Sequence, residues 1–271
     1  MEKRSTLEMI VVLACPAGRV GSSAIMGALD LGGYTAGRAE RMIRGGGMNP
    51  KGFFELRSQE RLLRRVFRGY YPGPTVPPRL DVVLDRCKRY MKEFRCLMHS
   101  EFSGEKKIAI KAPRWLTIPF YEQLHNDVDI RIVSLERDLD KQVRSTYRVW
   151  QQTHDPILMA ADNDQIKAWI RSWQEFADAM RSRYEAILPV YGLSFDELMS
   201  DPVAQSSQLL HWLGVPSPGA EALQGWFDSS LVERQSLPPI TRLEALKRGL
   251  KRRVQNAVRR PYTHYSPYIL R

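Results

Sequence analysis

The stretch from Ile10 to Leu29 constrains the fold of this chain more than any other part of the sequence. An apolar, β-branched run, Ile10–Leu13, leads through a loop of small residues into Ala24–Leu29, an apolar segment with helical character. A strand that turns through a tight loop into a helix N-terminus directs backbone N–H groups at one point, where they bind phosphate or sulfate groups. A glycine-bearing turn after any buried strand has a similar pattern, so this stretch alone leaves a purely structural loop open.

The loop is rich in the residue types that an anion site uses. Its candidate cofactor-binding residues are Ala17, Gly18, Arg19, Val20, Gly21, Ser22 and Ser23. The glycines allow a tight turn, the serines add hydrogen-bond donors, and Arg19 adds a fixed positive charge. A nucleotide-binding loop of the Walker A type has Lys immediately before the Ser, and here that position is Gly21. The sequence therefore indicates an anion site that differs from an ordinary ATP site.

The remainder of the chain has the pattern of an α/β protein. Three further short strands are predicted over 107–111, 130–135 and 193–195, and helices over about 56–68, 80–98, 139–150, 164–188 and 203–213. Strands separated by helices favour right-handed parallel crossovers. We therefore predict a three-layer α/β sandwich with a central parallel sheet flanked by helices.

Length and composition favour a soluble protein that stays in the cytoplasm. A chain of 271 residues suits one large α/β domain or two small ones, and we expect a single domain over 1–271. No apolar run is long enough to cross a bilayer, and Met1–Arg4 leads into a strand rather than a signal-peptide core. Three cysteines without metal-ligand spacing are typical of reduced thiols.

Positive charge is concentrated near the C-terminus. The formal net charge is +11, and the stretch 241–271 has nine Arg or Lys residues against one acid. We treat this stretch as a basic C-terminal extension. Its charge is compatible with an acidic partner such as nucleic acid, an anionic lipid at a membrane surface, an anionic glycan or a polyphosphorylated cofactor, or with a merely solvated helix.

Cations follow three of the predicted strands. Arg19 follows the first strand, Lys111 and Arg114 follow the second, and Arg137 follows the third. Ligands of parallel α/β sheets bind beyond the carboxyl ends of the strands. Convergence of these cations at one sheet edge implies a ligand with several negative charges.

From about Val11 to Gly214 these residues resemble the sulfotransferases that use 3′-phosphoadenosine-5′-phosphosulfate (PAPS). The loop around Arg19 is similar to the family's 5′-phosphosulfate loop. Arg137 at a strand end and Ser145 eight residues later reproduce the spacing of the family's 3′-phosphate site. Further similar segments are Asn49–Glu55, Lys111–Arg114 and Leu193–Gly214.

The resemblance implies a P-loop NTPase-like fold, PAPS as cofactor, a hydroxyl-bearing acceptor and no metal. Arg19, Ser22 and the loop amides would hold the sulfate, and Lys111 would add charge near the transferred group. Arg114 would do the same or brace its loop. Glu55 is the candidate general base, with Arg19 and Lys111 as the other catalytic candidates. A Glu in a first helical turn also complements the helix dipole, and this second role stays open for Glu55.

The chain departs from the family pattern at several positions, and two other classes of function remain. Ala112 stands where the family has Asp, Leu139 where it has Pro, and Pro113 where animal cytosolic enzymes have a catalytic His. A P-loop kinase would share the fold but needs a Lys beside Ser22 and a Mg²⁺ carboxylate, for which Asp138 is available. A non-enzymatic nucleic-acid binder would use the basic extension, although no nucleic-acid motif supports it and we expect no nucleic-acid partner.

Overall fold

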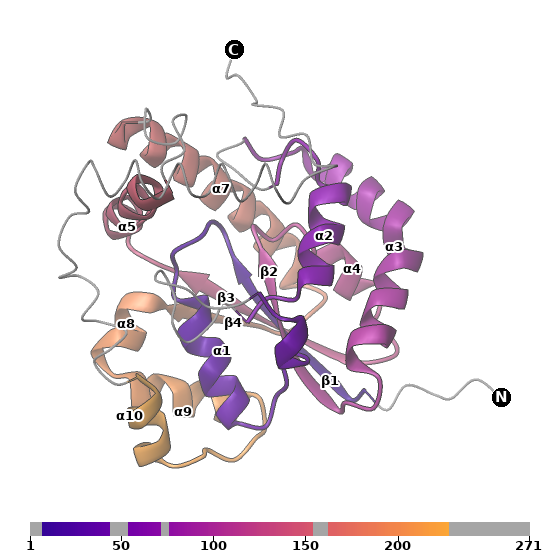
Figure 1. Ribbon diagram of the computed structural model, residues 1–271, viewed down its shortest axis with the longest axis vertical. Coiled ribbons are helices and arrows are strands. Elements are labelled where there is room, and N and C mark those ends of the chain that lie inside the picture. The colour runs from indigo at the N-terminus through magenta and orange to yellow at the C-terminus, as the bar shows by residue number, and fades with distance from the viewer. Residues whose placement is uncertain (1–6, 44–53, 72–75, 154–161, 228–271) are drawn as a thin grey trace.

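The computed structural model describes residues 7–43, 54–71, 76–153 and 162–227. Its centre is a four-stranded parallel sheet with the order β2-β1-β3-β4 (Figure 1). The strands are β1 (Met9–Cys15), β2 (Lys107–Pro113), β3 (Asp129–Glu136) and β4 (Val190–Ser194). This confirms the predicted three-layer α/β class with a central parallel sheet.

Helices cover both faces of this sheet (Figure 1). They are α1 (Ser22–Leu31), α2 (Arg57–Val66), α3 (Leu80–Phe102), α4 (Ile118–Glu122), α5 (Leu139–Thr153), α7 (Asn163–Tyr184), α8 (Phe195–Ser200), α9 (Pro202–Trp212) and α10 (Ala220–Phe227), with a 3₁₀ turn at Ala39–Arg41. In the ribbon, α1 lies with α8, α9 and α10, while α2, α3 and α4 lie together across the sheet. Every strand-to-strand connection within the sheet therefore passes through a helical layer, as parallel strands require.

Alternate residues of β1 belong to two separate cores. Ile10 and Val12 pack with residues of α2, α3, α4 and α7, whereas Val11 and Leu13 pack with residues of α1, α9 and α10. All four side chains are fully buried. A strand buried on both faces is a continuous apolar run, which is why the sequence at this point shows no alternation.

The structure corrects the prediction in detail. The second strand extends to Pro113 instead of ending at Lys111, with Cys15 of β1 opposite Pro113. Proline is tolerated there because β2 is an edge strand and Pro113 is its last residue. The short helices α4 and α10 were not predicted, since each is too short for a clear helical period.

Two expectations lie wholly or partly outside the described residues. The basic extension 241–271 and most of the Asn49–Glu55 segment fall there. Within the described ranges no helix combines the length and apolarity needed to cross a membrane. All three cysteines are described, and each is a free thiol.

Candidate active site

The loop between β1 and α1 has a strained backbone that is fixed from outside. Arg19 has φ 73° and Gly21 has φ 79°, both in the left-handed region. That conformation costs an ordinary L-residue roughly 1–2 kcal/mol, so Arg19 has to be held there. Two side chains of the β3–α5 region hold the loop: Arg137 donates to the Arg19 carbonyl at 2.8 Å, and the buried Gln142 donates to the Gly18 carbonyl at 2.8 Å.

Glycine is the only residue type that fits at position 21. A Cβ atom placed on it would lie 2.0 Å from the ring of Phe195, far closer than carbon atoms approach. Its carbonyl accepts from the backbone N–H of Ala24 at the start of α1. Phe195 therefore packs against the loop at the N-terminus of α1. Gly21 is the N-cap of this helix and has no side chain to cap it, which leaves the first backbone N–H groups of α1 available to a ligand.

Arg19, Arg137 and Ser145 come together, as their positions in the sequence predict. Arg19 Nε donates to Ser145 Oγ at 3.2 Å, and Arg137 contacts the Arg19 carbonyl. The Arg137 guanidinium lies over the ring of Phe195, with 4.6 Å between the guanidinium carbon and the ring centroid. Its Nε atom is buried and has no hydrogen-bond partner among the described residues. We call these three residues the anion cluster.

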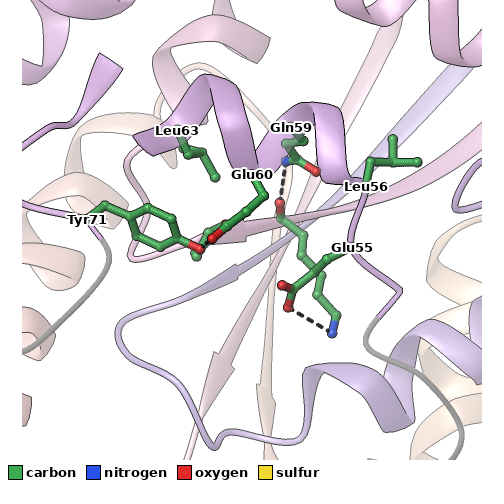
Figure 2. Close-up of a pocket in the computed structure, with 8 residues that line it drawn as sticks. Glu55, Leu56, Gln59, Glu60, Leu63 and Tyr71 are labelled. Atoms are coloured by element: carbon green, nitrogen blue, oxygen red, sulfur yellow. Dashed lines mark hydrogen bonds and ion pairs between the residues drawn. The ribbon is translucent and has the colours of Figure 1, made fainter. Parts of the chain in front are cut away.

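A second group of side chains lies at the end of β2. Lys111 is 4% exposed, and its Nζ lies 2.9 Å from Ser23 Oγ and 3.5 Å from Glu55 Oε1. Figure 2 shows Glu55 in the pocket that it lines with residues of α2. Burial raises the pKa of Glu55 against the opposing pull of Lys111, and burial lowers the pKa of Lys111. We call Lys111, Glu55 and Ser23 the lysine cluster. It combines a buried cation, a hydroxyl and a carboxylate that is more basic than usual.

Glu55 does not have the position that the helix-dipole alternative requires. Helix α2 begins at Arg57 with Leu56 as its N-cap, and Glu60 is the acid in its first turn. Glu55 therefore precedes the cap, and its side chain turns to Lys111. The structure favours a role for this carboxylate in the pocket over a role in stabilising α2.

The wall of this pocket comes from α2 and the residue Tyr71. Figure 2 shows Tyr71 directed at Glu60, whose carboxylate accepts its hydroxyl at 2.6 Å. Gln59, which is buried, donates to the Lys111 carbonyl at 2.8 Å and so fixes the end of β2. The space between these groups is about 10 Å³, the room of about one water.

Arg114 lies behind the wall of this pocket, with its guanidinium carbon 5.5 Å from the ring centroid of Tyr71. Its guanidinium donates to the Tyr70 carbonyl at 2.6 Å and lies 4.6 Å from the ring centroid of Trp173 and 5.3 Å from that of Trp169. Burial lowers its pKa to about 10. These contacts fit the bracing role; binding of the cofactor by Arg114 stays a prediction.

Several positioning residues were missed by sequence reasoning. Gln142, Gln59 and Phe195 act through contacts across the fold, and a Gln on a helix has no local signal for such a contact. Among the described residues no group of three or more His, Cys, Asp or Glu side chains is arranged to hold a metal ion.

The sequence around the anion cluster also matches a known family. Residues 128–219 match the model of the Sulfotransferase family. This sulfotransferase segment contains Arg137 and Ser145, together with β3, α5, α7, β4, α8 and α9. The predicted resemblance is therefore confirmed over the part of the chain that supplies most of the anion cluster.

Three solved structures are similar to the whole chain. The sulfotransferase domain from the curacin biosynthetic pathway is 14% identical with a TM-score of 0.42, and the match covers 93% of this chain and 97% of that chain. The sulfotransferase domain from the Synechococcus PCC 7002 olefin synthase is 12% identical, with a TM-score of 0.40 and 91% and 94% coverage. Retinol dehydratase in complex with androsterone and inactive cofactor PAP is 12% identical, with a TM-score of 0.41 and 84% and 65% coverage. A comparison with curated proteins gives no match. Likeness at this level carries no functional conclusion, which has to come from the site and the sulfotransferase segment.

Proposed function

We propose that this protein is a metal-independent sulfotransferase that uses PAPS to sulfate a hydroxyl group. The observation that carries the proposal is the anion cluster: Arg137 and Ser145, which lie in the sulfotransferase segment, meet Arg19 of the β1–α1 loop. Two arginines and a hydroxyl beside a helix N-terminus form a site for a ligand with several anionic groups.

The residues present fit PAPS. The Arg137 Nε–H is buried and has no hydrogen-bond partner in the described part of the chain, and a phosphate oxygen would satisfy it. The loop approaches Phe195 so closely that only glycine fits at 21, which leaves backbone amides facing outward at the start of α1. Arg137 and Ser145 would hold the 3′-phosphate, and the loop with Arg19, Ser22 and Ser23 would hold the 5′-phosphosulfate.

The lysine cluster supplies the groups that transfer needs. When bound, PAPS supplies the sulfuryl group, and the S–O bond to its phosphate breaks as the bond to the acceptor oxygen forms. Glu55 takes the proton of the acceptor hydroxyl, and its raised pKa brings its basicity closer to neutral pH. Lys111 and Ser23 donate toward the oxygen on which negative charge develops, in a water-poor setting where such donors act strongly.

The geometry gives less support to a kinase. The position before Ser22 is Gly21, and the carboxylate of Asp138 accepts from the backbone N–H of Lys141 at the start of α5. Asp138 therefore has a capping role that accounts for its place at the strand end.

A thermal-shift titration tests the proposal without knowledge of the acceptor. The full chain is titrated with adenosine 3′,5′-bisphosphate (PAP), AMP and ATP in the presence of EDTA, and each titration is repeated with Mg²⁺. At equal ligand concentration, a ligand that binds the native state more tightly raises the melting temperature more, so the order of affinities is read directly. We expect PAP to stabilise most, with no need for Mg²⁺. Equal shifts with PAP and AMP, or stabilisation by ATP that needs Mg²⁺, would overturn the proposal.

A further inference from the structure

The exposed side of α2 is an arginine surface next to the proposed reaction site. Arg57, Arg61, Arg64 and Arg65 of α2, and Arg68 two residues after its end, are all exposed, whereas Gln59, Leu62, Leu63 and Val66 are buried. At 3.6 residues per turn, Arg57, Arg61 and Arg64 lie within about 60° of one another around the helix axis and extend over about 10 Å. We call these five arginines the α2 arginine surface.

Most of this charge is not used inside the fold. Within the described residues Arg57, Arg61 and Arg68 form no ion pair, while Arg64 pairs with Glu60 and Arg65 with Glu93. A row of like charges on one helix face opposes folding slightly and needs a compensating reason. Guanidinium groups favour carboxylates, phosphates and sulfates, which they bind in a bidentate manner.

The α2 arginine surface and the lysine cluster meet at one residue. Glu60 contacts Arg64 on the exposed side, and it accepts from Tyr71 inside the pocket that also contains Glu55 (Figure 2). Glu55 itself stands two residues before α2. A molecule that lies along the arginines therefore passes the entrance to the proposed site of proton transfer.

The chemistry of this surface favours one kind of polyanion. The described part of α2 has no exposed aromatic ring on which a base stacks, and the exposed large apolar side chains, Leu31, Val76 and Ile187, lie outside it. Nucleic-acid bases and a membrane interior or apolar protein interface thus find no partner there. An acidic glycan has regularly spaced anions and many free hydroxyl groups, and it needs neither stacking nor apolar contact.

We propose that the α2 arginine surface binds an acidic, uronic-acid-bearing glycan and presents one of its hydroxyls to Glu55. This inference rests on the proposed sulfotransferase function and names the class of its acceptor.

The test compares two full-length variants that each lose three positive charges. One variant is Arg57→Gln/Arg61→Gln/Arg68→Gln, and the control is Arg38→Gln/Arg171→Gln/Arg183→Gln, whose arginines are exposed elsewhere. Affinity for a size-defined, unsulfated chondroitin oligosaccharide is measured at several salt concentrations, beside an RNA oligonucleotide and vesicles of phosphatidylserine and phosphatidylcholine. The basic extension is present in every protein, so its contribution cancels.

We expect the α2 variant to lose about tenfold in glycan affinity and the control to lose little, because three surface contacts are removed only from the former. A loss that is equal in the two variants, or equally large for RNA or vesicles, overturns the glycan assignment. Incubation of the wild type with PAPS and the oligosaccharide should add sulfate to it, and binding without transfer would also overturn the assignment. PAP affinity is measured in parallel: a failure there refutes the sulfotransferase function, whereas normal PAP affinity with no glycan effect refutes only this inference.

Discussion

The two clusters of the site are held in opposite ways. The anion cluster is partly open to solvent and has two arginines close together, held by a backbone carbonyl, a hydroxyl and the ring of Phe195. The lysine cluster surrounds an almost fully buried cation with a carboxylate and a hydroxyl. The first brings two guanidinium groups together with no carboxylate among its three members, whereas the second sets a carboxylate beside its cation. Changes to Arg137 and Ser145 should therefore act mainly on binding, and changes to the lysine cluster mainly on rate, with Arg19 of the β1–α1 loop between the two.

The largest effect is expected at Glu55. Glu55→Gln keeps the shape of the side chain but removes its ability to accept a proton, so turnover should fall by roughly 10²–10⁴-fold while PAP affinity stays nearly unchanged. Single-turnover rates and PAP titrations measure the two quantities. Glu60→Gln is the matched control in the same pocket, and it should retain most of the activity. A fully active Glu55→Gln variant would assign the proton to another group.

The same carboxylate should set the acid limb of the pH profile. Burial raises the pKa of Glu55 above its usual 4.5, and below that raised pKa the protonated group cannot act as a base. Turnover should therefore rise with pH, about tenfold per unit, until Glu55 is ionised. At high pH turnover should fall as Lys111 loses its proton, at a pH below its usual pKa of 10.5. The acid limb should be absent from Glu55→Gln; its persistence there would contradict the assignment.

The Arg19→Ala variant tests whether the effects on turnover and on PAP affinity can be separated. Its place in the β1–α1 loop predicts a loss of turnover of roughly 10²–10³-fold in Arg19→Ala, the usual effect of removing one donor to developing negative charge. Its contact with Ser145 adds a smaller loss of PAP affinity, of about tenfold. Kinetics and PAP titration with the same protein give the ratio of the two effects. Arg19→Lys, which keeps the charge, should recover part of the rate, and unchanged turnover in a folded Arg19→Ala would remove Arg19 from the mechanism.

Arg137 should act on binding alone and on one phosphate. Arg137→Ala should weaken PAP binding by roughly 1.5–3 kcal/mol and leave AMP binding almost unchanged, because only PAP has the 3′-phosphate. Calorimetric titration with both nucleotides gives the difference. Arg131→Ala is the control: this arginine lies on β3, the strand that Arg137 follows, and it contacts the Trp212 carbonyl and Asp129. An equal loss for AMP and PAP would show that Arg137 supports the loop and not the phosphate.

The sequence predicted the parallel sheet and the convergence of Arg19 and Arg137, because hydrophobic periodicity and strand ends are local properties that topology converts into neighbours. Ser145 was predicted beside Arg137 from the family resemblance, and its contact with Arg19 was not predicted. It did not predict how the loop is held. Gln142 reaches the Gly18 carbonyl from α5, and Phe195 reaches Gly21 from the start of α8. Such contacts depend on packing between segments that are more than a hundred residues apart, and nothing in the residue type marks them. The two possible roles of Glu55 were also inseparable in the sequence, since they differ by whether α2 begins at, or two residues after, that position.

The smallest effect is expected at Ser145, and it decides how the anion cluster works. Ser145→Ala removes one neutral donor, so PAP affinity should fall by about 0.5–1.5 kcal/mol, less than for Arg137→Ala. The hydroxyl also accepts from Arg19 Nε, so its loss leaves that arginine freer to move.

If Ser145 only binds the 3′-phosphate, the losses of PAP affinity in Ser145→Ala and Arg19→Ala should add in the double variant. If Ser145 orients Arg19, the double variant should lose less than the sum, since removal of Arg19 already removes that contact. The 3.2 Å contact predicts the second result, and Ser207→Ala on α9, outside the site, should leave PAP affinity unchanged. If the losses of PAP affinity in the two single variants add up to the loss in the double variant, each residue contacts the phosphate independently. The anion cluster would then be three separate contacts instead of one unit.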